Sequence, residues 1–128
     1  MSDLEFAQSC VEGDKQSWIE FLSRYSHLIY NYIYSVLAVK GRNFSSDQVE
    51  DIYQEIFHAL IKDNYKKLST YQGKNNCSLA SWLRQVTINF SIVYLRRLNL
   101  LFLLMQKMKE VFHFKIHLHL FQREQLNF

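Results

Sequence analysis

Apolar residues recur at steps of three and four along three stretches of the chain, the spacing that places side chains on one face of an α-helix. The first stretch carries Trp18, Phe21, Leu22, Tyr25, Ile29, Tyr32, Ile33, Val36 and Leu37. The second carries Val49, Ile52, Tyr53, Ile56, Phe57, Leu60 and Ile61. The third carries Leu79, Trp82, Leu83, Val86, Phe90 and Val93. The pattern therefore predicts three long amphipathic helices.

Polar and glycine residues mark where these helices begin and end. Asp14 and Ser78 can cap the first and third helices, because their side chains accept bonds from exposed backbone N–H groups. Ser45, Ser46 and Asp47 are candidates for the N-cap of the second helix, and Asp47 with Glu50 resembles a capping box. Gly41 is expected to end the first long helix.

The remaining parts of the first hundred residues predict a short helix and a loop. Asp3 to Val11 reads as a short helix, with Leu4, Ala7 and Val11 turned inward. Between Asn64 and Cys77 the periodicity fails, and a glycine and two asparagines indicate a loop. The chain has no proline and three glycines, which also favours helices. We predict an all-α bundle of three long helices and a short N-terminal helix.

The helical spacing of apolar residues is no longer sustained after Arg97. Residues 1–97 are expected to form the helical domain, and residues 98–128 an apolar tail with no recognisable helix-turn-helix, whose structure the sequence leaves open. Within the tail, HFKIHLHLF at positions 113–121 alternates apolar and polar residues as a strand does. That alternation argues against a membrane-surface helix, because a helix scatters these apolar residues around its axis.

The sequence predicts a soluble, cytoplasmic protein with no membrane partner. The longest apolar run, LNLLFLLM at Leu98–Met105, is much shorter than the ~20 residues of a membrane span. The N-terminal residues MSDLEFAQS lack the apolar core of a signal peptide. Cys10 and Cys77 fit neither a metal-binding spacing nor a disulfide framework, so we expect free thiols.

Charge is segregated along the chain. The segment 43–61 contains four acids, Asp47, Glu50, Asp51 and Glu55, and no lysine or arginine. The segment 62–97 contains seven basic residues and one acid. The first two acids suit the N-terminus of a helix dipole, but Asp51 and Glu55 lie further in. Two partners of opposite charge explain the segregation, and ordinary solvation of exposed faces is the alternative.

No arrangement typical of catalysis is present. His117 and His119 could face the same way on a strand, but no cysteine or carboxylate cluster accompanies them. No nucleophile has a recognisable setting, and no glycine-rich phosphate loop occurs. We therefore expect neither an enzyme nor a metal or other cofactor.

The basic half instead suits a single nucleic-acid strand. Cations neutralise phosphates, aromatic rings stack on bases, and amides read base edges. A loop with two asparagines leads into a basic helix on which Trp82, Asn89 and Arg96 share a stripe spaced by seven. The alternative is that the aromatics belong to the core and the lysines are only solvated. The candidate DNA-binding residues are Tyr71, Asn75, Asn76, Trp82, Arg84, Gln85, Asn89, Arg96 and Arg97.

Three motifs in this order resemble one protein family. EGDKQSWIEFLSRY is similar to the opening helix of the extracytoplasmic-function group of bacterial RNA polymerase sigma factors. DQVEDIYQEIFHAL resembles the segment of sigma-70 region 2 that binds the polymerase, and LSTYQGKNNCSLASWLRQVTINFSIVYLRR resembles the segment that reads the −10 element. The resemblance covers about residues 4–97. The C-terminal region 4 domain of the family, which reads the −35 element, has no counterpart here.

The resemblance implies roles for individual residues. Asp51, Gln54 and Glu55 are implied to contact the β′ clamp helices of core RNA polymerase, while Phe57 holds the helix against its own core. Tyr71 and the loop 72–78 are implied to bracket a base flipped from the non-template strand of promoter DNA. Asn89 is implied to lie near that base and Trp82 near the point of melting. Arg96 and Arg97 are implied to hold phosphates.

Two functions follow from the resemblance. The first is a sigma-like module that binds core polymerase and recognises and melts the −10 element, with an anti-sigma protein as a further partner that the family allows. The second is a polymerase-binding decoy or regulator without independent promoter recognition. The family often has an aromatic residue where this chain has Leu79, so its base preference does not transfer.

Overall fold

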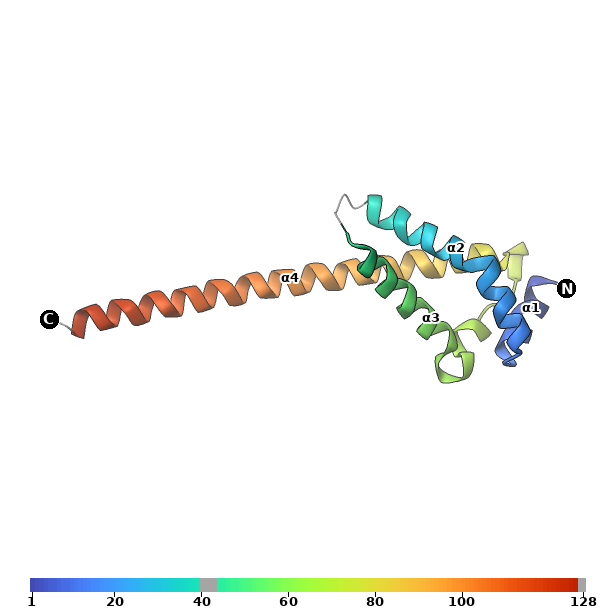
Figure 1. Cartoon of the computed structure of the whole chain (residues 1–128), viewed down its shortest axis with the longest axis horizontal. Helices are drawn as coiled ribbons and strands as arrows, with labels where there is room; N and C mark the ends of the chain where they lie inside the picture. The colour runs from blue at the N-terminus through green and yellow to red at the C-terminus, as the bar shows by residue number, and fades with distance from the viewer. Residues whose placement is uncertain (40–43, 127–128) are drawn as a thin grey trace. The chain divides into compact units, whose positions relative to one another are not determined.

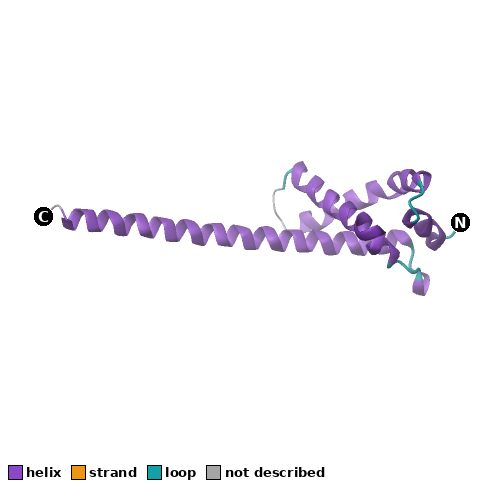
Figure 2. Ribbon diagram, turned by 90° about the horizontal axis from the view of Figure 1, so that it is seen from below, coloured by secondary structure: helices purple, strands orange, loops and turns teal. Residues whose placement is uncertain are grey.

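The computed structural model describes residues 1–39 and 44–126. They form four α-helices: α1 (Asp3–Val11), α2 (Lys15–Val39), α3 (Ser46–Ser69) and α4 (Leu79–Leu126) (Figure 1). A short 3-10 turn, η1 (Lys74–Asn76), lies between α3 and α4. None of the described residues forms a strand (Figure 2). The structure therefore confirms the all-α prediction; Gly41, the expected end of the first long helix, lies outside the described residues.

Side-chain caps start the helices. The Asp14 carboxylate accepts bonds from the backbone N–H of Ser17 at 3.2 Å and from its hydroxyl at 2.7 Å, as predicted. The Ser78 hydroxyl accepts the N–H of Ser81 at 3.1 Å, also as predicted. Of the N-cap candidates for α3, Ser45 is confirmed, whereas the capping-box prediction for Asp47 and Glu50 was wrong. The box is formed two residues earlier, because Ser45 and Gln48 each bond the backbone N–H of the other.

The chain divides into two compact units, Met1–Val93 and Tyr94–Phe128. In the first unit α1 packs against α2 and α3, and α2 packs against α3. An aromatic cluster joins them, in which the Phe21 ring lies 4.9 Å from Trp18 and 6.2 Å from Phe57. The fully buried large residues of the core are Phe21, Ile29, Ile33, Leu37, Val49, Ile52, Ile56, Leu60, Leu68, Leu79, Leu83 and Thr87.

A few inward positions were assigned wrongly. Leu22, Ile61 and Val93 are each more than 40% exposed, because each lies at the edge of its helical stripe. On α1 the residues buried are Phe6, Ala7 and Cys10, whereas Leu4 and Val11 are only half-buried. The apolar stripe of α1 is thus rotated by about one position from the prediction.

The predicted loop begins inside α3. Asp63, Asn64 and Tyr65 all have left-handed backbone conformations, with φ of 55°, 59° and 59°, and they interrupt the helix. The interruption places the Tyr65 ring on Trp18 of α2, with the centroids 5.6 Å apart. Helical structure resumes at Lys66, so the non-helical segment is shorter than the sequence indicated.

The second unit contains the remainder of α4. The strand-like interpretation of residues 113–121 was wrong, because α4 continues through them to Leu126. A strand needs a neighbouring strand to satisfy its backbone N–H and C=O groups, whereas a helix satisfies them internally. Within the described ranges, one helical stretch, Leu79–Leu120, is long and apolar enough to cross a membrane by length and composition alone.

Candidate functional site

The acidic face of α3 lies opposite its buried stripe. Ile52 and Ile56 are fully buried, whereas Asp51 and Gln54 are exposed and Glu55 is half-buried. Between Ser46 and Ile61 the helix carries four carboxylates and no lysine or arginine. Asp51 takes part in no ion pair among the described residues. The helix thus presents a negative surface to solvent.

One part of this face is built by two helices. The Tyr30 hydroxyl of α2 donates to a Glu50 carboxylate oxygen at 2.7 Å, and the Gln54 amide donates to the other oxygen at 3.0 Å. The Tyr30 ring stacks on Tyr53 with the centroids 4.1 Å apart and the planes within 5°. Gln54 is therefore held in one position, on a platform that α2 and α3 share.

These contacts shift two pKa values in opposite directions. The hydrogen bonds from Tyr30 and then from Gln54 lower the pKa of Glu50, because they favour the ionised carboxylate. Burial, followed by the bond to Glu50, raises the pKa of the Tyr30 phenol. The sequence places Glu50 in the acidic segment but does not indicate Tyr30 as part of the site. The i,i+4 spacing of Glu50 and Gln54 is a usable signal, but the approach of Tyr30 depends on how α2 packs.

Tyr71 is a core residue in this structure. Its side chain is 4% exposed, and its ring lies 5.7 Å from that of Trp82. Its hydroxyl donates to the backbone carbonyl of Cys77 at 2.7 Å. Burial, followed by the nearby Asp3 carboxylate, raises the pKa of the phenol. This geometry matches the core alternative for Tyr71, and the side chain holds the loop in place.

The loop after Tyr71 exposes its amides. Asn75 and Asn76 are exposed and have left-handed φ values of 57° and 58°, and Gly73 before them has a φ of 66°. Asparagine and glycine tolerate this conformation better than other residues do. The turn closes with a bond from the Cys77 N–H to the Lys74 carbonyl at 3.1 Å. The loop is therefore held at its base while its amide-bearing tip faces solvent.

The first turns of α4 continue this surface. Trp82 is half-buried, and Gln85 and Asn89 follow it on the same helical face, both exposed. The Gln85 amide donates to the Asn89 carbonyl oxygen at 3.1 Å. The exposed Arg84 guanidinium lies 5.3 Å from the ring centre of Tyr32, a cation–π contact. Trp82, Gln85 and Asn89 are thus brought together, whereas Arg84 turns toward α2.

The last two predicted DNA-binding residues belong to the second unit. Arg96 and Arg97 are both exposed. The Arg97 guanidinium lies 5.9 Å from the centre of the Tyr94 ring. The two arginines therefore provide solvent-facing positive charge in that unit.

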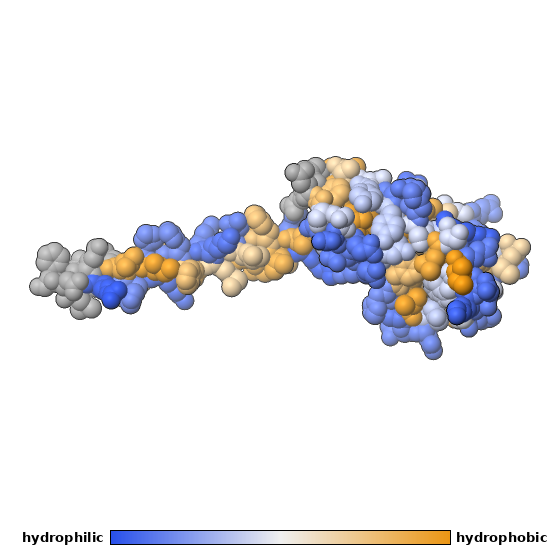
Figure 3. Space-filling model, in the orientation of Figure 1, coloured by the Kyte–Doolittle hydropathy of each residue, from blue (hydrophilic) through white to orange (hydrophobic). Residues whose placement is uncertain are grey.

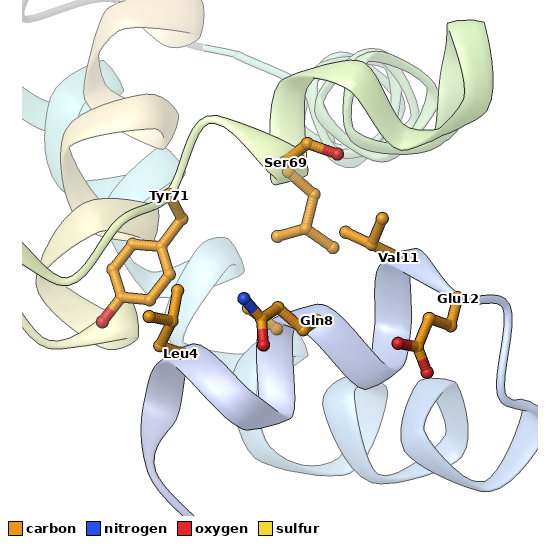
Figure 4. Close-up of a pocket in the computed structure, with 8 residues that line it drawn as sticks. Leu4, Gln8, Val11, Glu12, Ser69 and Tyr71 are labelled. Atoms are coloured by element: carbon orange, nitrogen blue, oxygen red, sulfur yellow. The ribbon is translucent and has the colours of Figure 1, made fainter.

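A pocket of about 430 Å³ opens beside Tyr71, between α1 and the end of α3 (Figure 4). Leu4 and Val11 of α1 give it apolar walls, while Gln8 and Glu12 line it with polar groups. Its formal charge comes from the Glu12 carboxylate, which repels phosphate. We therefore do not count this pocket as part of the nucleic-acid surface.

The histidines considered for metal binding are arranged differently from the sequence expectation. His113 and His117 lie one helical turn apart, with their Nε2 atoms at 2.8 Å, and His119 is not part of this pair. Among the described residues no group of three or more His, Cys, Asp or Glu side chains is placed to hold a metal ion.

Comparison of the chain with protein-family models, with curated proteins and with solved structures finds no match.

Proposed function

We propose that this chain is a sigma-like module that binds core RNA polymerase through the acidic face of α3. In the same proposal, the loop 72–78 and the first turns of α4 bind the non-template strand of the promoter −10 element. Three sequence motifs that resemble region 2 of the extracytoplasmic-function sigma factors support this proposal. The proposed site of action is the cytoplasm, with no catalytic step and no cofactor.

The exposure of Asp51 and Gln54 opposite a buried apolar stripe is the observation that carries the proposal. The exposed Asp51 carboxylate attracts a basic surface, and charges at an interface fix the orientation of docking. The resemblance supplies that surface, the β′ clamp helices. Because Gln54 is hydrogen-bonded to Glu50, which Tyr30 also bonds, less side-chain freedom is lost when the partner binds.

The nucleic-acid half is supported by exposed amides rather than by exposed rings. Asn75, Asn76, Gln85 and Asn89 present donors and acceptors that can read the edges of unstacked bases. Trp82 keeps part of its ring accessible for stacking. Tyr71 acts in this proposal by positioning the loop, since its own ring is buried.

Capture of core polymerase tests the docking half. The double variant Asp51→Arg with Glu55→Arg should lose at least about 90% of capture, because two attractive charges become repulsive. The matched control, Glu5→Arg with Glu12→Arg, makes the same change of charge on α1 and at its C-cap and should capture normally. Circular dichroism verifies that both proteins fold. Normal capture by the α3 variant overturns the docking proposal.

Binding to a single-stranded −10 oligonucleotide tests the other half. In the presence of core polymerase, Asn89→Ala and Asn75→Gly with Asn76→Gly should each weaken binding about tenfold, a loss of about 1.4 kcal/mol; glycine removes the amides and keeps the left-handed backbone. Asn31→Ala, an exposed amide on α2, is the control. In vitro transcription then separates the two functions. Initiation supports a sigma factor, and inhibition supports the decoy.

A further inference from the structure

The second unit carries an exposed apolar helix face. Seven residues lie within one sector of α4 at steps of one and three, and each side chain is between 51% and 69% exposed. They are Leu100, Leu101, Leu104, Met105, Met108, Val111 and Phe112. Figure 3 shows this as orange side chains running along the helix, with blue side chains beside them. Exposed apolar surface of this extent marks an interaction site.

The other side of the same segment is mixed, because Phe102 and Leu103, which are 58% and 59% exposed, lie there beside polar residues. Asn99, Gln106 and Glu110 follow one another at helical spacing opposite the apolar face. Lys107 and Lys109 lie one on each border between the two faces, since they are two residues, or about 200° of helical rotation, apart. Residues 104–112 therefore have an apolar face with Lys107 on one border and Lys109 on the other, whereas residues 98–103 are apolar on most sides.

This segment is not built to cross a bilayer. Arg96 and Arg97 precede it, and Lys107 and Lys109 interrupt it. The uncharged run between them, Leu98–Gln106, is about 14 Å long at 1.5 Å per residue, about half of the ~30 Å hydrocarbon core. Charges at the centre of a span are costly, whereas charges beside an apolar face suit the membrane–water interface.

We propose that residues 98–112 of α4 bind the surface of an anionic lipid bilayer, with the apolar face in the headgroup and acyl boundary. Lys107 and Lys109 then extend their methylene stems along the face and place their ammonium groups among lipid phosphates. The charges beside the apolar face favour an anionic lipid surface over a second copy of the chain as its binding partner. Two such helices would bring lysines against lysines, with Glu110 on the far side of each.

The helical structure changes the argument made from sequence. The alternation at residues 113–121 spoke against a membrane-surface helix, but the apolar face lies before that segment, in residues 98–112. The helix also gives the charged residues fixed places relative to that face. The proposal goes beyond the proposed function, because it concerns the second unit and requires neither polymerase nor DNA.

Flotation of the full chain with lipid vesicles tests the proposal. The chain should bind vesicles of phosphatidylcholine with phosphatidylglycerol about tenfold or more tightly than vesicles of phosphatidylcholine alone. Lys107→Glu with Lys109→Glu should lose this preference, and Leu104→Gln with Met108→Gln should lose binding to both. Glu110→Gln, on the polar face, should bind as the parent does or slightly better.

In the vesicle assay, three outcomes overturn the proposal: no binding to either vesicle, equal binding to both, or full binding by the Leu104 and Met108 variant. A stable dimer in sedimentation equilibrium that the Leu104 and Met108 variant dissolves assigns the face to a second copy instead. The results of vesicle flotation and sedimentation equilibrium do not depend on whether the chain captures core polymerase. The vesicle variants change the second unit, whereas the polymerase variants change α3.

Discussion

The Asp3 carboxylate accepts a hydrogen bond of 2.9 Å from the backbone N–H of Leu79, a residue 76 positions later in the chain. The first N–H groups of a helix have no partner within it, so this bond caps the start of α4 with a side chain from α1. Leu79 is fully buried. The bond therefore fixes the end of the loop 72–78 to the N-terminal helix.

Replacing Asp3 by alanine should destabilise the first unit by about 1 kcal/mol, within the 0.5–2 kcal/mol typical of a lost cap. Urea unfolding followed by helical circular dichroism measures the loss. Glu12→Ala removes the same charge from the other end of α1 and should change stability by less than about 0.5 kcal/mol. Equal stability of the Asp3 variant and the parent would show that the bond contributes nothing in solution.

The buried hydroxyl of Tyr71 gives a second prediction. Tyr71→Phe keeps the ring against Trp82 but removes the donor to the Cys77 carbonyl, which should cost about 1–2 kcal/mol. Tyr71→Ala also leaves a cavity and should cost about 3–5 kcal/mol. Urea unfolding measures both, with Tyr34→Phe on the exposed face of α2 as the control. If the alanine variant is as stable as the parent, Tyr71 does not belong to the core.

The helices were predictable because each one carries its signal locally. The amphipathic stripe from Val49 to Leu60 and the caps at Asp14 and Ser78 depend on residues within a few positions of each other. Burial at the stripe edges was less predictable. Whether Ile61 is covered depends on neighbours from other helices, which the sequence does not place.

The candidate site was only partly predictable for the same reason. The exposure of Asp51 and Gln54 follows from the helical period. The bond from Tyr30 to Glu50 and the burial of Tyr71 depend on packing between segments distant in sequence. The left-handed turn at Asp63 to Tyr65 contains no glycine, so the sequence did not indicate it. The tail was misread because alternation favours a strand only where another strand is available for pairing.

The two thiols should differ sharply in reactivity. Burial, followed by Asp14 and then Glu20, raises the pKa of Cys10 to about 11, whereas Cys77 is exposed. At pH 8 a thiol reagent should label Cys77 quickly, whereas it should label Cys10 only as fast as the protein unfolds. Cys77→Ser should abolish the fast phase, and Cys10→Ala the slow one. Rapid labelling of both thiols in folded protein contradicts the burial of Cys10.

The raised pKa of Cys10 also affects the stability of the protein at high pH. Because the pKa of Cys10 is higher in the folded protein than the ordinary value of 9.0, the folded state binds this proton more tightly. The stabilisation is fully present below pH 9 and is lost as the pH rises from there to about 11. In unfolding experiments across this range, Cys10→Ala should show a shallower decline of stability than the parent. An identical decline in the two proteins would place the cause elsewhere.

The Tyr30 to Glu50 bond makes the acidic face sensitive to low pH. The pKa of Glu50 is lowered first by the Tyr30 hydroxyl and second by the Gln54 amide, so the contacts favour the carboxylate. Their contribution to stability is present above the ordinary pKa of glutamate and is lost as the pH falls through the lowered value. Tyr30→Phe should raise the pKa of Glu50 more than Gln54→Ala does, as measured by carboxyl carbon chemical shifts during an acid titration. Because Tyr30→Phe also keeps the ring stacked on Tyr53, a larger effect of Gln54→Ala would mean that the hydroxyl bond is not formed in solution.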